Sequence, residues 1–155
     1  MAQQPDRRAT LYLHRGSRIR ERVDTTDYGI PITGPEVHVL PSDIDDMSLG
    51  VAIADVASRA LRGVPHPDMD SPDLLWPLLQ AAGVASWSTF IRGTVDVSIF
   101  IEGSDYTFVP SINRGPRGGF AASPHRLAAA SDDPAGIGRA AKEGIALASV
   151  DPTRG

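Results

Sequence analysis

Alternation of apolar and polar residues along the chain predicts a set of β-strands. The clearest two cover residues 94–102 and 106–112, and the short Gly-Ser-Asp turn between them predicts a hairpin. Residues 10–14 and 36–40 also have strand composition, whereas residues 18–23 give a weaker signal because their alternation places three arginines on one face. Together these strands predict a small, mostly antiparallel β-sheet.

Apolar residues spaced three and four positions apart predict four helices. The helices are expected over residues 44–62, 72–83, 86–93 and 131–148. Ser42 and Ser131 are the expected N-caps of the first and last helices, because a serine hydroxyl accepts a hydrogen bond from a free backbone N–H group. Pro77 is expected to delay or kink the second helix, because proline lacks an N–H and crowds the preceding turn.

Glycine and proline mark the connections between these elements. Residues 25–35 are predicted to be turns and residues 113–119 a flexible basic loop, which a short strand near 125–128 follows. The order of strands, helices, hairpin and helix predicts the α+β class, a single domain in which the sheet packs against about four helices.

The length of 155 residues fits one domain. That domain is expected to cover 10–150, with 1–9 as a disordered N-terminal tail and 151–155 as a C-terminal tail. The absence of cysteine excludes disulfides, thiolate metal sites and a cysteine nucleophile. No apolar run approaches the ~18 residues of a membrane span, and the start MAQQPDRR lacks the apolar segment of a signal peptide, so the cytoplasm is the expected location.

Charge is distributed unevenly along the chain. Residues 1–22 carry a net charge of +4, residues 23–110 a net charge of −10, and residues 111–155 a net charge of +2. An acidic central segment repels phosphate backbones, which disfavours nucleic-acid binding. It suits a basic protein partner, although the same charge also fits an ordinary solvated surface.

The residue types that carry catalysis or bind metals occur without the spacing that those functions need. The four histidines have no metal-site spacing, and no G-x-S-x-G or phosphate-loop motif is present, so no metal, cofactor or catalytic residue is expected. The least improbable enzyme is a small hydrolase that uses His66 with Asp68 or Asp70.

One combination of motifs does point to a family. WPLLQAAGVASWSTFIRG at 76–93, the hairpin after it and RGGF at 117–120 resemble bacterial immunity proteins of contact-dependent growth inhibition and related polymorphic toxin systems. The stretch VLPSDIDDMSLGVAIADVASRAL at 39–61 and the last helix, from about 133 to 147, also follow the family pattern. The resemblance covers roughly residues 37–148.

This resemblance implies a small protein without catalysis that acts by protein–protein interaction. Such a protein binds the toxic C-terminal domain delivered by a neighbouring cell, often a nuclease, and blocks its active site or substrate path. Since a nuclease needs a basic cleft for phosphate, an acidic inhibitor can cover that cleft by charge complementarity. The protein is expected to be a monomer or a weak homodimer. The hydrolase and a regulatory interaction domain unrelated to toxins remain the alternatives.

The expected toxin-binding surface draws on seven acids of the central segment, with two arginines of the basic loop as the next candidates. These residues are Asp43, Asp45, Asp46, Asp55, Asp68, Asp70 and Asp73, with Arg114 and Arg117. The alternative is that these acids only cap helices and keep the protein soluble.

Charge reversal at Asp68 and Asp70 tests this surface. We expect the double variant Asp68→Lys/Asp70→Lys to associate more slowly with the toxin domain and with less dependence on ionic strength, while its thermal stability is unchanged. Changing Asp43 or Asp45 instead would also remove about 0.3–1 kcal/mol of helix-dipole support. Unchanged association at low salt would exclude this loop and leave Arg114 and Arg117 as the next candidates.

Overall fold

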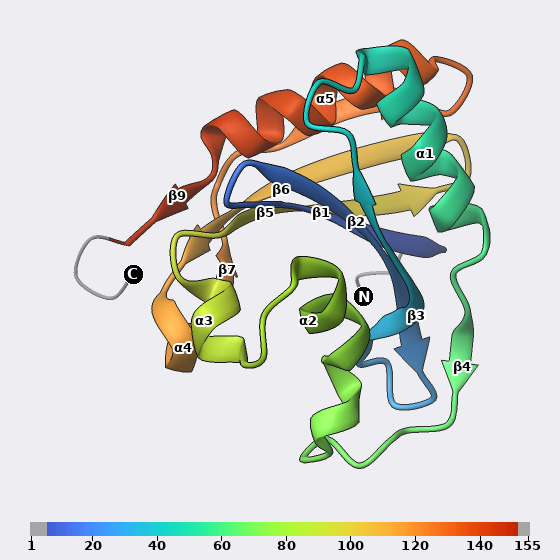
Figure 1. Cartoon of the computed structure of the whole chain (residues 1–155). Helices are drawn as coiled ribbons and strands as arrows, with labels where there is room; N and C mark the ends of the chain where they lie inside the picture. The colour runs from blue at the N-terminus through green and yellow to red at the C-terminus, as the bar shows by residue number, and fades with distance from the viewer. Residues whose placement is uncertain (1–5, 152–155) are drawn as a thin grey trace.

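The computed structural model describes residues 6–151, which form one α+β domain with a nine-stranded sheet (Figure 1). The strands are β1 (Arg7–His14), β2 (Ser17–Thr26), β3 (Pro31–Leu40), β4 (Arg62–Val64), β5 (Val95–Glu102), β6 (Asp105–Asn113), β7 (Phe120–Ala122), β8 (Leu127–Ala130) and β9 (Ser149–Val150). The helices are α1 (Asp46–Ser58), α2 (Trp76–Ala82), α3 (Trp87–Ile91), α4 (Gly115–Gly118) and α5 (Pro134–Leu147), with a 3₁₀ turn, η1 (Pro72–Leu74). The predicted fold class is confirmed.

The main path of the sheet runs β3-β2-β1-β5-β6-β7, and all neighbours on it are antiparallel. Only β4 beside β2 and β9 beside β6 pair in parallel. β1 lies at the centre, with Leu11 opposite Arg20 of β2 on one side and Val97 of β5 on the other. The predicted β5–β6 hairpin is present, with Ile99 opposite Phe108.

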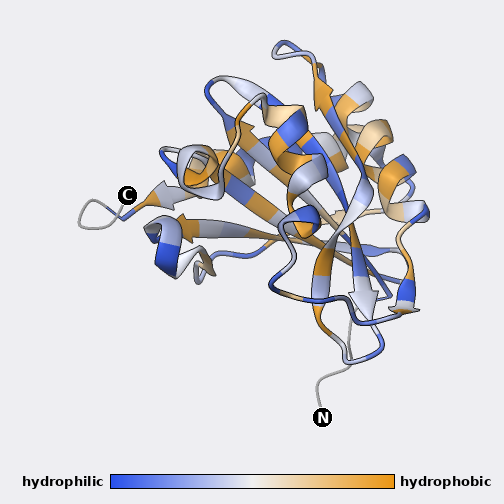
Figure 2. Cartoon of the chain, turned by 60° about the horizontal axis from the view of Figure 1, so that its bottom comes forward, coloured by the Kyte–Doolittle hydropathy of each residue, from blue (hydrophilic) through white to orange (hydrophobic). Residues whose placement is uncertain are grey.

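Helices lie on both faces of this sheet. α1 and α5 cover one face, where Leu49, Ile53 and Ile137 pack against Leu11 and Ile99 in the larger core (Figure 1). α2 and α3 cover only part of the other face, which leaves the rest of it open. Figure 2 shows hydrophobic segments on strands and helices inside the molecule and hydrophilic segments on many of its loops. Among the described residues, no helix has the length and apolar character needed to cross a membrane.

The two helices of the larger layer touch through glycine. A Cβ atom on Gly50 of α1 would lie 1.7 Å from the carbonyl oxygen of Pro134, and one on Gly138 of α5 would lie 1.9 Å from the carbonyl oxygen of Asp46. Real Cβ contacts are never this short, so each helix approaches the backbone of the other only because these positions lack a side chain.

The three arginines of β2 point to the face that α1 covers. Arg18 donates to the carbonyl oxygen of Ser42, and Arg20 donates to that of Ala52 at 2.7 Å. Arg22 is held by a two-pronged ion pair with Asp24, whose N–O distances are 2.9 and 3.0 Å. The weak strand signal at these arginines therefore marked a genuine strand, whose arginine side chains bind α1, the segment before it and nearby acids.

Acids of the central segment complete this network. Glu36 of β3 lies 2.8 Å from Arg22 and 2.6 Å from Arg59, and these two arginines, Arg59 first, lower its pKa to about 2. Asp55 of α1 bonds Arg59 at 2.6 Å and lies 3.5 Å from Arg20. β2, β3 and the end of α1 are thus joined by alternating charges.

The domain begins before its predicted boundary. β1 begins at Arg7 and Ala9 is only 2% exposed, so the prediction of a disordered tail over 1–9 was wrong for residues 7–9, which pair with β2 and β5. Residues 1–5 of that tail and 152–155 of the C-terminal tail lie outside the described residues.

The turn predicted at 25–35 is shorter than expected. β2 continues to Thr26 and β3 begins at Pro31, so only 27–30 form the turn. The Thr26 hydroxyl accepts hydrogen bonds from the N–H groups of Tyr28 and Ile30, each at 3.2 Å, and this closes the turn locally. Proline and glycine in β3 are tolerated because the strand lies at an edge of the main path.

Several helix ends also differ from the prediction. The N-caps are Asp45 for α1 and Asp133 for α5, in place of Ser42 and Ser131. α1 ends at Ser58, and Arg62 starts β4.

The second predicted helix is divided into η1 and α2. Pro77 lies in the first turn of α2, where no N–H donor is needed. The basic loop contains the short helix α4, so the described chain has five α-helices where four were expected.

Replacing Gly138 by alanine tests the contact between α1 and α5. We expect Gly138→Ala to lower the free energy of unfolding by about 1–3 kcal/mol, because the added methyl group forces the helices apart. This loss occurs although alanine is favoured over glycine in helices by about 1 kcal/mol. Urea unfolding measures the change, and Ala146→Gly at an exposed position of α5 isolates the helix-propensity term. A Gly138→Ala variant more stable than the native chain would contradict the contact.

Candidate functional site

The part of the sheet that α2 and α3 leave open carries a row of polar side chains. Thr10 of β1 lies directly opposite Glu21 of β2 on one side and Ser98 of β5 on the other. Tyr12 and Asp96 form the next row along the same face, since alternate residues of a strand share a face. Five polar residues from three neighbouring strands thus meet on one surface.

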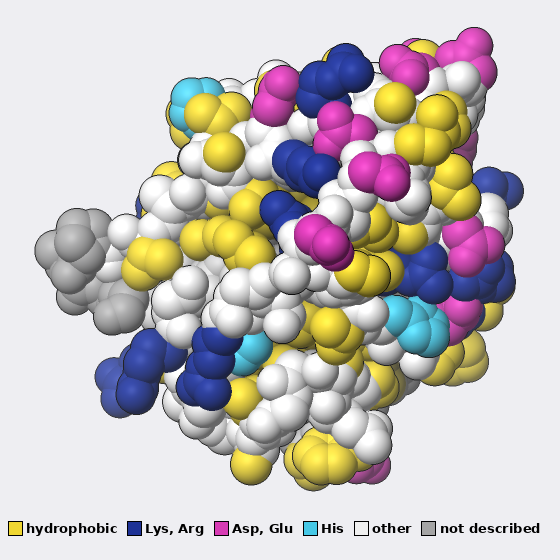
Figure 3. Space-filling model, turned by 45° about the horizontal axis from the view of Figure 1, so that its top comes forward, with side chains coloured by type: hydrophobic (Ala, Val, Ile, Leu, Met, Phe, Trp, Pro, Cys, Tyr) yellow, Lys and Arg dark blue, Asp and Glu magenta, His cyan; other side chains and the backbone are white. Residues whose placement is uncertain are grey.

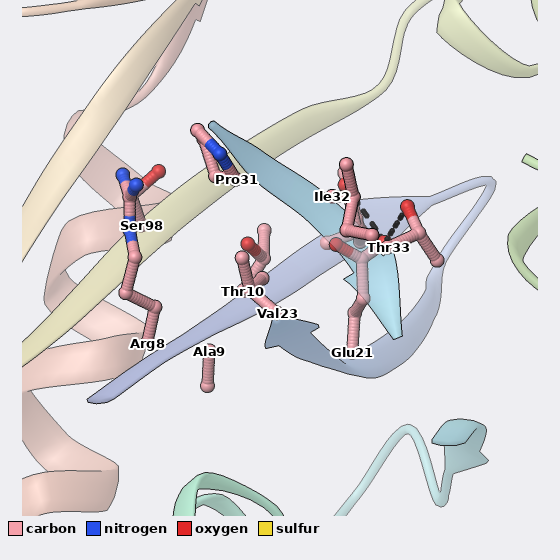
Figure 4. A pocket seen from close by; sticks show the side chains of 10 residues that line it. Arg8, Ala9, Thr10, Glu21, Val23, Pro31, Ile32, Thr33 and Ser98 are labelled. Carbon is pink, nitrogen blue, oxygen red and sulfur yellow. Dashed lines mark hydrogen bonds between the residues drawn. The ribbon is translucent and has the colours of Figure 1, made fainter. Parts of the chain in front are cut away.

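Two adjoining cavities of about 230 and 190 Å³ hollow this surface, and Arg8 and Ser98 line both of them. Thr10 and Glu21 line the first cavity, and Asp96 lines the second. We call the two cavities together the polar groove. Figure 4 shows Arg8 and Glu21 on opposite sides of Thr10 in the first cavity. The groove exists because the floor is made of short side chains on the central strands.

Glu21 lies at one end of the groove and is only 3% exposed. The hydroxyls of Tyr12 and Thr33 donate hydrogen bonds to its Oε2 atom at 3.1 and 3.3 Å. Burial raises the pKa of Glu21 to about 8, against the lowering effect of the Tyr12 hydrogen bond, and nearby Asp96 raises it further. The side chain is therefore mostly protonated at neutral pH.

Asp96 lies in the second cavity and is 5% exposed. Burial raises the pKa of Asp96 to about 7, although a hydrogen bond with the Ser111 side chain acts to lower it. Its Oδ1 atom is buried and has no hydrogen-bond partner among the described residues. A buried acceptor without a partner is costly in a folded protein and is uncommon.

Arg8 is a cation that lines both cavities of the groove. Its guanidinium lies over the Phe100 ring, 4.6 Å from the ring centre, and burial lowers its pKa. Within the described residues it forms no ion pair with Glu21 or Asp96. The groove therefore combines two buried acids and one cation that do not neutralise each other.

The seven acids predicted to bind a partner do not form one surface. Asp43, Asp45 and Asp46 surround the start of α1, where Asp45 accepts from the Ser48 N–H and Asp46 pairs with Lys142 at 2.9 Å. Figure 1 places the start of α1 at the top of the molecule and the segment between β4 and α2 at the bottom. Figure 3 shows acidic side chains interspersed with basic ones over the face of α1 and α5.

The remaining predicted acids lie elsewhere. Asp55 belongs to the arginine network under α1. Asp68, Asp70 and Asp73 fall together between β4 and α2, where Asp68 accepts from the Asp70 N–H at 3.0 Å. Their role in binding stays a prediction.

The two predicted arginines are close together. Arg114 precedes α4 and Arg117 lies in its last turn, and both line a hollow with Pro116 and Gly118. Trp87 of α3 donates to the Pro116 carbonyl oxygen at 3.2 Å, which ties α4 to the helices on this face. Their part in partner binding also stays a prediction.

The hydrolase arrangement does not assemble. His66 contacts the Thr26 hydroxyl at 3.3 Å and packs against the Tyr28 ring, and within residues 6–151 no hydrogen bond or ion pair joins it to Asp68 or Asp70. In the same part of the chain, no three His, Asp or Glu side chains gather as a metal site would require.

No protein-family model matches the chain, and no curated protein matches it in sequence. Solved structures share its fold, among them the following two. The protein of unknown function NMB0488 from Neisseria meningitidis is 15% identical, with a TM-score of 0.73 over 96% of this chain and 99% of that chain. A chain of the CdiA-CT/CdiI toxin and immunity complex from Yersinia pseudotuberculosis is 11% identical, with a TM-score of 0.70 over 92% of this chain and 97% of that chain. The chain thus has, over nearly its whole length, a fold that occurs in a toxin–immunity complex.

Sequence reasoning missed the polar groove. The signal was present, since Asp96 and Ser98 interrupt one face of an otherwise apolar strand and Glu21 does so in β2. The pairing of β1 with β5, which brings these residues together, joins segments more than 80 positions apart and has no local signature.

The raised pKa of Glu21 predicts how stability changes with pH. Between its ordinary pKa of 4.5 and its folded value of about 8, the folded protein holds a proton that the unfolded chain releases. The free energy of unfolding should therefore fall as pH rises through this interval, by at most about 1.4 kcal/mol per pH unit for this group. We expect Glu21→Gln to flatten the dependence.

Urea unfolding at about pH 5, pH 7 and pH 9 measures this effect. Glu143→Gln, on the exposed side of α5, is the matched control and should keep the native dependence. Equal slopes for Glu21→Gln and the native chain would contradict the assignment.

Proposed function

We propose that this chain is an immunity protein that binds and neutralises the C-terminal domain of a contact-dependent or related polymorphic toxin in the cytoplasm. The observation that carries the proposal is the fold, which matches a chain of the Yersinia toxin and immunity complex along 97% of that chain's length. The motif order from residue 37 to residue 148 supports the proposal independently, because it is a property of the sequence alone.

The proposed mechanism is binding without catalysis. Its support is the chemistry of the described residues: His66 and its neighbouring acids are not joined, and the ionisable groups of the polar groove lack a nucleophile paired with a base. An inhibitor of this kind acts by covering the toxin's active site or substrate path. A nuclease is the toxin class that we expect, because its basic cleft complements the acids of this chain.

Co-expression tests this function directly. The toxin C-terminal domain encoded beside this chain's gene should arrest growth when produced alone and should be tolerated when this chain is produced with it. The two proteins should co-purify as a stable complex. As a matched control, an unrelated toxin domain should arrest growth whether or not the chain is present.

Two results would overturn the proposal. If the neighbouring toxin domain arrests growth although this chain is present in folded, soluble form, neutralisation is excluded. Protection without any complex would instead point to a different mechanism, such as enzymatic removal of the toxin's product.

A further inference from the structure

Three acids among residues 6–151 are buried, and their surroundings differ. Asp24 is 5% exposed and is paired with Arg22 by two hydrogen bonds. Glu21 and Asp96 are similarly buried, yet neither forms an ion pair within the described residues. An isolated buried carboxylate is strongly disfavoured, so the burial of Glu21 and Asp96 without an ion pair costs the folded protein free energy.

Each of these two acids also keeps an oxygen atom free of protein donors. Both hydrogen bonds to the Glu21 carboxylate end on Oε2, and none reaches Oε1 from residues 6–151. Asp96 Oδ1 has no partner in the same set. Both residues line the polar groove, so a molecule in the groove can supply the missing donors.

We propose that the polar groove receives a lysine or arginine side chain of the toxin domain, whose donors bind Glu21 and Asp96. The inference rests on the proposed function, which supplies the partner. A cationic side chain matches the site because it brings only donors and carries the charge that ionised carboxylates require. The short floor residues Thr10 and Ser98 leave the depth that such a long side chain needs.

The groove also selects against other occupants. An anion would meet two acids, and an apolar side chain would leave both free oxygen atoms without donors. Arg8, held over Phe100 at the other side of Thr10, can pair with an acid beside the inserted cation. A partner segment that carries a cation and a neighbouring acid therefore fits the groove in one orientation, with its cation at Glu21 and Asp96 and its acid at Arg8.

Entry of a cation expels protons, so binding should depend on pH. The groups that face the two acids are Tyr12 and Arg8 of β1 and the hydroxyls of Thr33 and Ser111, while nearby His14 is bound to Thr94 at 2.7 Å. Tyr12 and Arg8 do not titrate near neutral pH, since burial raises the pKa of Tyr12 well above its ordinary value and Arg8 remains a guanidinium. Affinity is therefore expected to increase as pH rises past 7 and 8, where Asp96 and Glu21 ionise.

Calorimetry with the neighbouring toxin domain tests the proposal at about pH 6, pH 7.5 and pH 9. We expect the native chain to bind about tenfold or more tightly at the highest pH than at the lowest. Glu21→Gln and Asp96→Asn should each weaken binding about 30-fold or more at high pH and reduce the pH dependence. Glu143→Gln and Asp132→Asn, on exposed positions outside the groove, are the matched controls and should bind as the native chain does.

Both groove variants keep hydrogen-bonding side chains of the same shape, and urea unfolding confirms that they fold. A double-mutant cycle then identifies the partner residue: one Lys→Gln or Arg→Gln change in the toxin domain should show a coupling of about tenfold or more with Glu21→Gln. Native binding by folded groove variants, or no coupled toxin residue, would overturn the groove as the cation site while leaving the immunity function intact. No binding by the native chain would overturn the immunity function itself.

Discussion

The arginines of β2 lie under α1, where they need counter-charges and hydrogen-bond acceptors, and this requirement shapes much of the molecule. Arg20 and Arg22 are held by the Ala52 carbonyl group and by acids of α1, of β3 and of β2 itself. Glu36 of β3 pairs with Arg22 of β2, and Arg59 at the end of α1 pairs with the same Glu36 carboxylate. Part of the large negative charge of the central segment is therefore used inside the domain, opposite the positive charge of the first strands.

The sequence predicted the helices and strands better than it predicted their ends, pairing and packing. Alternation in both strands and the Gly-Ser-Asp turn between them predict the hairpin from 94 to 112, which the structure contains. Helix α1 was also found, but Asp45 caps it in place of Ser42, since both residue types can accept from a free N–H and only the backbone path decides between them. The start of β1 was missed because Arg7 and Arg8 look like a solvated tail; their partners lie in β5, far along the chain.

The two faces of the sheet satisfy buried charge differently. On the face under α1, acids and arginines neutralise each other within the chain. On the opposite face, burial raises the pKa of Glu21 to about 8 and that of Asp96 to about 7, so both acids hold protons near neutrality that ordinary surface acids release. The sequence shows that these acids interrupt apolar strand faces, but it does not show the pairing of β1 with β5 that brings them together.

The floor of the polar groove has an evolutionary consequence. Thr10 and Ser98 point into the groove, whereas the residues on either side of them in the strands, such as Leu11 and Ile99, point into the main core. Substitutions at every second position can reshape the recognised surface while the intervening positions keep the core unchanged. Under the proposed function, successive single substitutions in the groove can adjust binding to a changing toxin while the core positions maintain the fold.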